Sequence, residues 1–209
     1  MDEHAWDLRY AGKELVWSAE PNRWVVEEVA GLLPGQGLDL ACGEGRNTLW
    51  LAEQGWTVTG VDFSAAGLAR ADALARGRGD AVARRLTWAQ ADLTTYRPEP
   101  SSVDLVVVCY LHLPAPDRRR LLRAAGAALR PGGHLLVVGH DTTNPTEGVG
   151  GPSDPAVLFT AEDVLADVLG ARSGEGPAAS GLVVVRAERV GRPTEEGVAL
   201  DALAHLRRE

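Results

Sequence analysis

The chain has 209 residues, of which 45% are hydrophobic and 24% are charged, and its formal net charge is −8. This composition is typical of a globular protein with a sizeable core, and the acidic balance disfavours general binding to nucleic acid or to membrane surfaces. Two cysteines are too few for a disulfide framework, and no apolar run reaches the roughly 20 residues that a membrane helix needs. The acidic N-terminus lacks the apolar segment of a signal peptide. We therefore expect one domain over residues 1–209 in a reducing cytoplasm.

The first half of the chain alternates between helical and strand patterns. Apolar positions spaced as on one helix face follow Pro21 and stop at Pro34, and Ser64 can cap a later helix. Short apolar runs that end at a glycine-rich turn or at an aspartate predict strands. The expected elements are helices at 20–33, 46–54 and 65–76, and strands at 38–41, 56–62 and 85–92.

The second half continues the alternation and ends in strands. Residues 104–110 are apolar almost throughout, as a strand covered on both faces must be. Thr160 and Asp163 resemble a capping box, and 173–180 is expected to be a loop. The expected elements are strands at 104–110, 134–139, 182–190 and 198–206, the last with helix as an alternative, and helices at 116–129 and 161–169. The order predicts an α/β fold with a doubly wound, mostly parallel sheet.

Polar and small side chains gather where the expected strands end. In a doubly wound sheet, ligands bind beyond the carboxyl ends of the strands, at the switch in strand order. The residues at or just past such ends are Cys42, Asp62, Asp92, Cys109, Tyr110, His140 and Asp141. We expect them to line one crevice. The Gly- and Pro-rich segment 140–155 is long for a structureless connection, and such segments are often functional.

The turn Gly43-Glu44-Gly45 begins like a dinucleotide-binding fingerprint but lacks its third glycine, since Thr48 stands there. Asp62 ends the second expected strand, where an acid accepts hydrogen bonds from ribose hydroxyls in any nucleoside site. Asp39 precedes the turn, and its carboxylate would repel a pyrophosphate but attract an ammonium or a sulfonium. These acids favour S-adenosylmethionine over a nicotinamide dinucleotide.

Four segments together resemble the successive motifs of the class I S-adenosylmethionine-dependent methyltransferases. They are LDLACGEGRNTLWLAEQGWTVTGVDFS, AQADL, DLVVVCYLHLP and ALRPGGHLLVVGHD, within residues 38–141. The GEGRN form and the N-terminal WDLRYAGKELVW are most similar to the tellurite-resistance and thiopurine-type branch, which acts on small molecules. The resemblance implies a Rossmann-like seven-stranded sheet whose last strand is antiparallel.

The resemblance also implies which residues hold the cofactor. Asp39, Ala41, Gly43 and Gly45 would line its methionine side, Asp62 and Phe63 would hold ribose and adenine, and Ala91, Asp92 and Leu93 would edge the adenine. Cys109 and Tyr110 would lie beneath it, and Trp6, Tyr10 and Trp17 would fold over it as a lid, although they could be plain core aromatics. Cys42 and Asn47, in the same turn and helix start, complete the expected cofactor-binding set.

Three residues are candidates for proton transfer. His140 and Asp141 leave the fifth strand together and could supply a general base, or they could only bind backbone amides of the loop. His112 follows the fourth strand and is either a further base or a polar packing residue. No spacing typical of a metal site occurs, so we expect no metal.

We therefore expect methyl transfer from S-adenosylmethionine to a small-molecule acceptor by in-line displacement. The alternatives are a nicotinamide-dependent oxidoreductase, a nucleic-acid methyltransferase and a non-catalytic adenosine-binding module. We expect residues 1–34 to form a helical lid, 35–141 the cofactor-binding core, and 142–209 the substrate loop and final strands. The expected protein is a monomer or homodimer with no nucleic-acid or membrane partner.

Overall fold

The computed structural model describes residues 3–10, 12, 19–170 and 181–209, and in them seven strands form one sheet. The sheet order is β3-β2-β1-β4-β5-β7-β6, and only β7 runs antiparallel to its neighbours. This confirms the predicted fold class. The strands are β1 (Gln36–Leu40), β2 (Thr57–Asp62), β3 (Leu86–Gln90), β4 (Val103–Cys109), β5 (Leu129–His140), β6 (Leu182–Thr194) and β7 (Gly197–Arg208).

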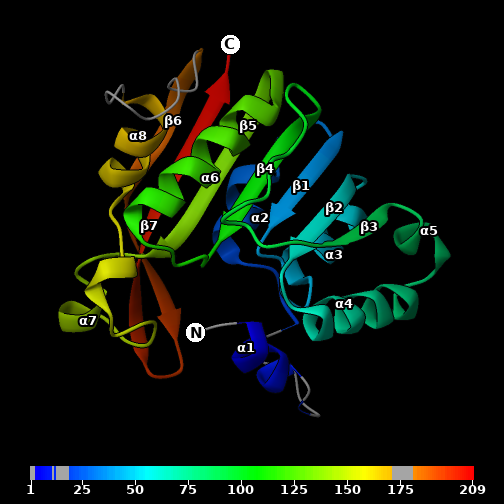
Figure 1. Cartoon of the computed structure of the whole chain (residues 1–209), viewed down its shortest axis with the longest axis horizontal. Helices are drawn as coiled ribbons and strands as arrows, with labels where there is room; N and C mark the ends of the chain where they lie inside the picture. The colour runs from blue at the N-terminus through cyan, green and yellow to red at the C-terminus, as the bar shows by residue number, and fades with distance from the viewer. Residues whose placement is uncertain (1–2, 11, 13–18, 171–180) are drawn as a thin grey trace.

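Helices cover both faces of the sheet, and α1 lies beside the start of α4, beyond the end at which β1 and β4 finish (Figure 1). The helices are α1 (Glu3–Tyr10), α2 (Arg23–Val29), α3 (Arg46–Glu53), α4 (Ala65–Gly77), α5 (Asp80–Ala83), α6 (Ala115–Ala128), α7 (Asn144–Glu147) and α8 (Ala161–Leu169), with a 3-10 turn at Pro155–Val157. No helix in these described ranges is long and apolar enough to cross a membrane.

The core consists of two apolar layers, one on each face of the sheet. Side chains of α6 and α8 pack against one face, and side chains of α2 and α3 pack against the other. In β4, Val106 and Val108 belong to the first layer, whereas Leu105 and Val107 belong to the second. A strand buried in this way is apolar at every position, which explains the pattern seen in the sequence.

Local signals explain where α2, α4 and α8 begin. The Ser64 side chain accepts a hydrogen bond from the backbone N–H of Gly67, and Thr160 forms a full capping box with Asp163. The helix predicted at 20–33 is shorter than expected, because the Asn22 side chain caps α2 and the helix ends at Val29. The segment 140–155 is less irregular than expected, since it contains α7. The loop predicted at 173–180 lies outside the described residues.

Candidate functional site

A cavity of about 870 Å³ opens at the carboxyl ends of β1, β2 and β4. Its wall contains most of the residues predicted from the sequence, so the structure brings side chains from five separate segments to one place. The predicted residues that line it are Trp6, Tyr10, Ala41, Cys42, Gly43, Asn47, Asp62, Phe63, Asp92, Leu93, Cys109, Tyr110 and His112. The crevice expected at the strand ends is therefore present.

Asp62 holds the glycine turn at the mouth of the cavity. Its two carboxylate oxygens accept hydrogen bonds from the backbone N–H groups of Gly43, at 2.8 Å, and of Ser64, at 2.9 Å. Each oxygen keeps a lone pair beyond these bonds. Gly43 has φ +53°, a conformation that glycine adopts without strain, and Ala41 two residues earlier has φ 64°. The role of Asp62 toward ribose hydroxyls stays a prediction.

Asp39 lies behind the cavity wall and is 1% exposed. Its Oδ2 accepts a 2.6 Å hydrogen bond from the Thr48 hydroxyl, whereas its Oδ1 is buried without a hydrogen-bond partner in the described chain. Burial raises the pKa of Asp39 to about 7, against the Thr48 hydrogen bond and the nearby Arg46 charge, which lower it. An acid this poorly compensated favours a positively charged ligand in the adjoining cavity.

Gly45 and Thr48 have packing roles that the sequence did not distinguish from ligand contact. Gly45 has φ +80° and starts α3, and a Cβ on it would lie 2.9 Å from the Trp88 ring and 3.0 Å from the Ala71 Cβ. Gly45 does not line the cavity, so its predicted cofactor contact is not supported by this geometry. Thr48 is fully buried beneath the turn. It stands where a dinucleotide-binding fingerprint has its third glycine, and its hydroxyl donates a hydrogen bond to Asp39.

The N-terminal helix α1 closes one side of the cavity. Tyr10 is 5% exposed and packs over the turn, because a Cβ on Gly43 would lie 2.6 Å from its hydroxyl oxygen. Asp7 accepts hydrogen bonds from the Ser64 hydroxyl and from the backbone of α4. Trp6 stacks on Tyr10 with ring centroids 5.4 Å apart. Both aromatics therefore lie where a lid was predicted, and Trp17 lies outside the described residues.

The loop after β3 forms the predicted adenine side. Asp92 and Leu93 line the cavity, whereas Ala91 does not and instead donates its backbone N–H to the Asp62 carbonyl. The Asp92 Oδ1 accepts hydrogen bonds from the backbone N–H and hydroxyl of Thr94, each at 2.8 Å. Contacts of this loop with a nucleobase stay a prediction.

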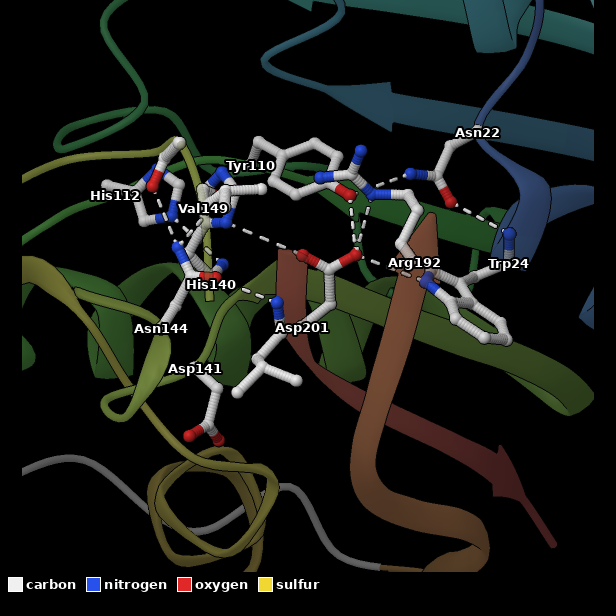
Figure 2. A network of polar contacts seen from close by, with 12 residues as sticks. Asn22, Trp24, Tyr110, His112, His140, Asp141, Asn144, Val149, Arg192 and Asp201 are labelled. Atoms are coloured by element: carbon white, nitrogen blue, oxygen red, sulfur yellow. Dashed lines mark hydrogen bonds and ion pairs between the residues drawn. The ribbon is translucent and has the colours of Figure 1, made fainter. Parts of the chain in front are cut away.

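A buried polar network begins at Tyr110, at the base of the cavity (Figure 2). Tyr110 has φ 56°, and its hydroxyl donates to Asp201 Oδ2 at 2.8 Å and accepts from the Asn22 amide at 3.0 Å. The same Oδ2 also accepts from Trp24 Nε1 at 3.2 Å and from Arg192 Nε at 2.9 Å. Burial, followed by the Asp201 charge, raises the pKa of the Tyr110 hydroxyl, which holds it neutral.

His140 and Asp141 do not face each other, and Asp141 binds the loop, which is the second of the two roles considered for the pair. Consecutive residues of a strand point to opposite faces of the sheet, so the two side chains diverge (Figure 2). The Asp141 Oδ1 accepts from the backbone N–H and hydroxyl of Thr143, at 2.9 and 2.8 Å, which is the loop-binding alternative. Neither residue is among those that line the cavity. The centroid of the His140 ring lies 5.0 Å from that of Tyr110 and 5.4 Å from that of His112.

His112 lines the cavity but is poorly suited to take a proton. Its Nε2 accepts a 3.2 Å hydrogen bond from the backbone N–H of His140. Burial and the neighbouring His140 lower the pKa of His112 to about 4. A histidine held in this way acts as a neutral packing residue, which is the other of the two roles considered for it.

Four members of the network at Tyr110 were not predicted from the sequence, namely Asn22, Trp24, Arg192 and Asp201. Asp201 could have been noticed in the sequence, because it is the single acid in the apolar strand VALDALAHL. A carboxylate buried in such a strand requires hydrogen-bond or charged partners. Arg46 and Glu44 also line the cavity. Within the described ranges, no group of three histidine, cysteine or acidic side chains comes together in a way that could hold a metal ion. Both cysteines are free thiols.

Comparison with known proteins finds methyltransferases. Residues 38–133 match the family model described as a methyltransferase domain. A curated relative, the ubiquinone biosynthesis O-methyltransferase of Vibrio parahaemolyticus, is 33% identical over 141 residues, which are 65% of this chain and 57% of that protein. The chain thus spans little more than half the length of the curated relatives it matches.

Solved structures share the fold. The glycopeptide N-methyltransferase MtfA in complex with S-adenosylmethionine aligns with a TM-score of 0.67 at 19% identity, over 92% of this chain and 88% of that one. TehB from Haemophilus influenzae aligns with a TM-score of 0.68 at 17% identity, over 99% of this chain and 67% of that one. At these identities the likeness shows the fold alone, so the tellurite-resistance and thiopurine-type branch stays a prediction. Residues 38–133 of the chain thus match a methyltransferase domain, and its seven-stranded sheet has the fold of these methyltransferase structures.

Proposed function

We propose that this protein binds S-adenosylmethionine in the cavity and transfers its methyl group to a small-molecule acceptor. The observation that carries the proposal is the buried Asp39 carboxyl, whose Oδ1 has no hydrogen-bond partner among the described residues, behind a glycine turn that Asp62 holds in place. An orphaned buried acid fits a ligand that carries an ammonium and a sulfonium, and it does not fit a pyrophosphate. When bound, the cofactor supplies a methyl group on positively charged sulfur, which is already activated for in-line displacement.

The protein's own contribution is orientation and exclusion of water. Arg46 lines the cavity at the first turn of α3 and can pair with the carboxylate of the cofactor. Trp6 and Tyr10 cover the glycine turn from α1, so α1 acts as the lid of the binding core, whereas α2, which also lies within the lid expected at 1–34, packs against the sheet. The buried Glu44 forms a 3.0 Å ion pair with Arg70 of α4, which also donates to the Tyr10 carbonyl at 2.9 Å. This link fixes the lid to the body of the domain.

The acceptor pocket is the wall opposite the glycine turn. Leu111, Leu113 and the segment 152–157 line that part of the cavity, so residues 142–209 supply the substrate loop. Two of the curated relatives are ubiquinone biosynthesis O-methyltransferases by name, which supports an oxygen acceptor, whereas a third, from Alcanivorax borkumensis, is a ribosomal RNA methyltransferase that is 37% identical over 114 residues. Asp141 and the segment it caps shape this loop and take no proton.

Two alternatives receive less support. A nicotinamide dinucleotide needs a glycine where Thr48 is buried under the turn, and its pyrophosphate would meet the Asp39 charge. A nucleic-acid substrate is disfavoured by the net charge of −8. We infer a cytoplasmic enzyme, monomeric or homodimeric, that acts without a metal.

The proposal is tested by following transfer of radiolabelled methyl groups from S-adenosylmethionine to a phenol, a thiol and an amine. We expect transfer to one of these classes and formation of S-adenosylhomocysteine in equal amount. The control is Asp62→Ala, which removes the acceptor of two backbone hydrogen bonds in the turn and should abolish transfer. Transfer to none of the acceptors, with S-adenosylhomocysteine no higher than in the control, would contradict the proposal.

A further inference from the structure

The partner of His140 is Asp201, which lies directly opposite it on the antiparallel strand β7. The His140 Nδ1 lies 3.5 Å from Asp201 Oδ1, and neither atom has a hydrogen-bond partner among the described residues, each other included. Asp201 is 0% exposed. The register of β5 and β7 therefore fixes a histidine and a carboxylate face to face inside the protein.

The other carboxylate oxygen of Asp201 is fully occupied. Its Oδ2 accepts from Trp24, Tyr110 and Arg192, so three donors fix the plane of the carboxylate (Figure 2). A buried carboxylate is stable as an ion when donors and an opposite charge surround it, and Arg192 supplies that charge. Among the described residues Oδ1 accepts no hydrogen bond, and it lies 3.5 Å from His140 Nδ1.

The second ring nitrogen of His140 is left for a ligand. Nε2 makes no hydrogen bond with the described residues, and the side chain keeps 11% of its surface exposed. His140 itself is not among the residues that line the cavity, but its ring lies next to those of His112 and Tyr110, which do line it. Gly151 covers the ring closely, because a Cβ there would lie 2.7 Å from the His140 Cδ2 and 2.9 Å from Nε2.

We propose that Asp201 is a positioning residue that holds the His140 imidazole with Nδ1 protonated and Nε2 bare, so that Nε2 serves as the base for a hydroxyl or amine acceptor. This inference rests on the proposed function. As the acceptor oxygen or nitrogen bonds to the methyl carbon, the carbon–sulfur bond breaks with its electron pair on sulfur, and the acceptor's proton passes to Nε2. Asp201 stays ionised and stabilises the imidazolium that results.

The charged groups around His140 suit this role. Burial and Arg192 of β6 lower the pKa of His140, whereas Asp201 of β7 raises it. The remaining neighbours, Tyr110 and His112, are held neutral by burial. His140 is therefore neutral and able to accept a proton at neutral pH, and a charged ring would be stabilised only by Asp201.

The test is nitrogen–proton NMR of the ligand-free full chain with ¹⁵N-labelled histidine, in which His140→Gln identifies the His140 signals. We expect the Nδ1-protonated tautomer in the wild type at pH 7.5. In Asp201→Asn the three donors hold the amide oxygen in the place of Oδ2, so the amide nitrogen faces Nδ1 and the ring should change to the Nε2-protonated tautomer. Trp24→Phe keeps the carboxylate and should keep the wild-type tautomer.

An Nε2-protonated ring in the wild type would overturn the inference, even if Asp201→Asn does not fold. A second readout separates it from a structural role. With 3,4-dihydroxybenzoate as acceptor, Asp201→Asn should lower kcat at least 100-fold, with unchanged affinity for S-adenosylmethionine, whereas transfer to benzenethiol should change less than threefold. Equal losses for both acceptors would refute the base role. Failure of S-adenosylmethionine to bind the wild type would instead refute the proposed function.

Discussion

Replacing Asp39 by asparagine should stabilise the ligand-free protein at high pH while weakening its binding of cofactor. Burial raises the pKa of Asp39 from 3.8 to about 7, so the folded protein holds a proton there that the unfolded chain releases. Folding stability contributed by this group is therefore fully present below about pH 4 and is lost as the pH rises to about 7. Asparagine resembles the protonated acid and escapes that loss.

The magnitude follows from the two pKa values. A group whose pKa rises from 3.8 to about 7 on folding costs about 4 kcal/mol once it is ionised, and about 3 kcal/mol of that is incurred between pH 5 and pH 8. The Thr48 hydroxyl can donate to the asparagine side-chain oxygen as it does to Oδ2. We therefore expect the stability of Asp39→Asn relative to wild type to rise by about 3 kcal/mol between these pH values.

The assay is urea unfolding of both ligand-free proteins at pH 5, 6, 7 and 8, with calorimetric titration of S-adenosylmethionine at pH 8. Removing the charge should weaken cofactor binding about tenfold. Asp72→Asn, an exposed aspartate on α4, is the matched control for removal of one charge away from the cavity. A stability difference that stays constant with pH, or that falls as the pH rises, would refute the reasoning about this buried acid.

Three further predictions concern the backbone and buried charges. Ala41→Gly should stabilise the protein by about 0.5–1 kcal/mol, because φ 64° is strained for alanine, whereas the helical control Ala52→Gly should lose about 1 kcal/mol; urea unfolding distinguishes them, and losses in both would contradict the strain. Asp167→Ala should cost about 3 kcal/mol in the same assay, since it leaves two buried arginine side chains of α6 without the carboxylate they share at 2.7 and 3.0 Å, and a cost below about 1 kcal/mol would show that pair to be unimportant. Gly151→Ala should displace the His140 ring and lower methyl transfer to a phenol without changing the affinity for S-adenosylmethionine, and an unchanged rate would show that the loop yields instead.

The sequence predicted the cavity well because its residues follow strand ends. Hydrophobic runs that stop at Gly43, Asp62 and Tyr110 locate those ends without knowledge of the sheet, and the carboxyl ends of parallel strands meet at one edge. The resemblance to methyltransferase motifs, which follow one another in the same order, supported the same strand ends. The sequence could not show which residues near the turn reach the cavity surface. Asp39 and Gly45 are close in the chain to the lining residues, yet they do not line the cavity.

The proton-transfer residues were harder to predict, because their partner comes from a distant strand. His140 and Asp201 are 61 positions apart in the numbering and meet only through the β5–β7 register, which no local pattern encodes. The period of a strand, by contrast, already argues against the adjacent pair His140 and Asp141. An isolated aspartate in the last apolar strand was the available signal.

Calorimetric titration of the purified full chain decides whether the cavity binds S-adenosylmethionine. We expect binding of one S-adenosylmethionine per chain, no heat with NADH, and loss of binding in Gly43→Asp, whose Cβ would overlap the Tyr10 hydroxyl at 2.6 Å. Circular dichroism confirms that the variant is folded. Binding of NADH in place of S-adenosylmethionine, or the same affinity for S-adenosylmethionine in wild type and folded variant, would contradict the account.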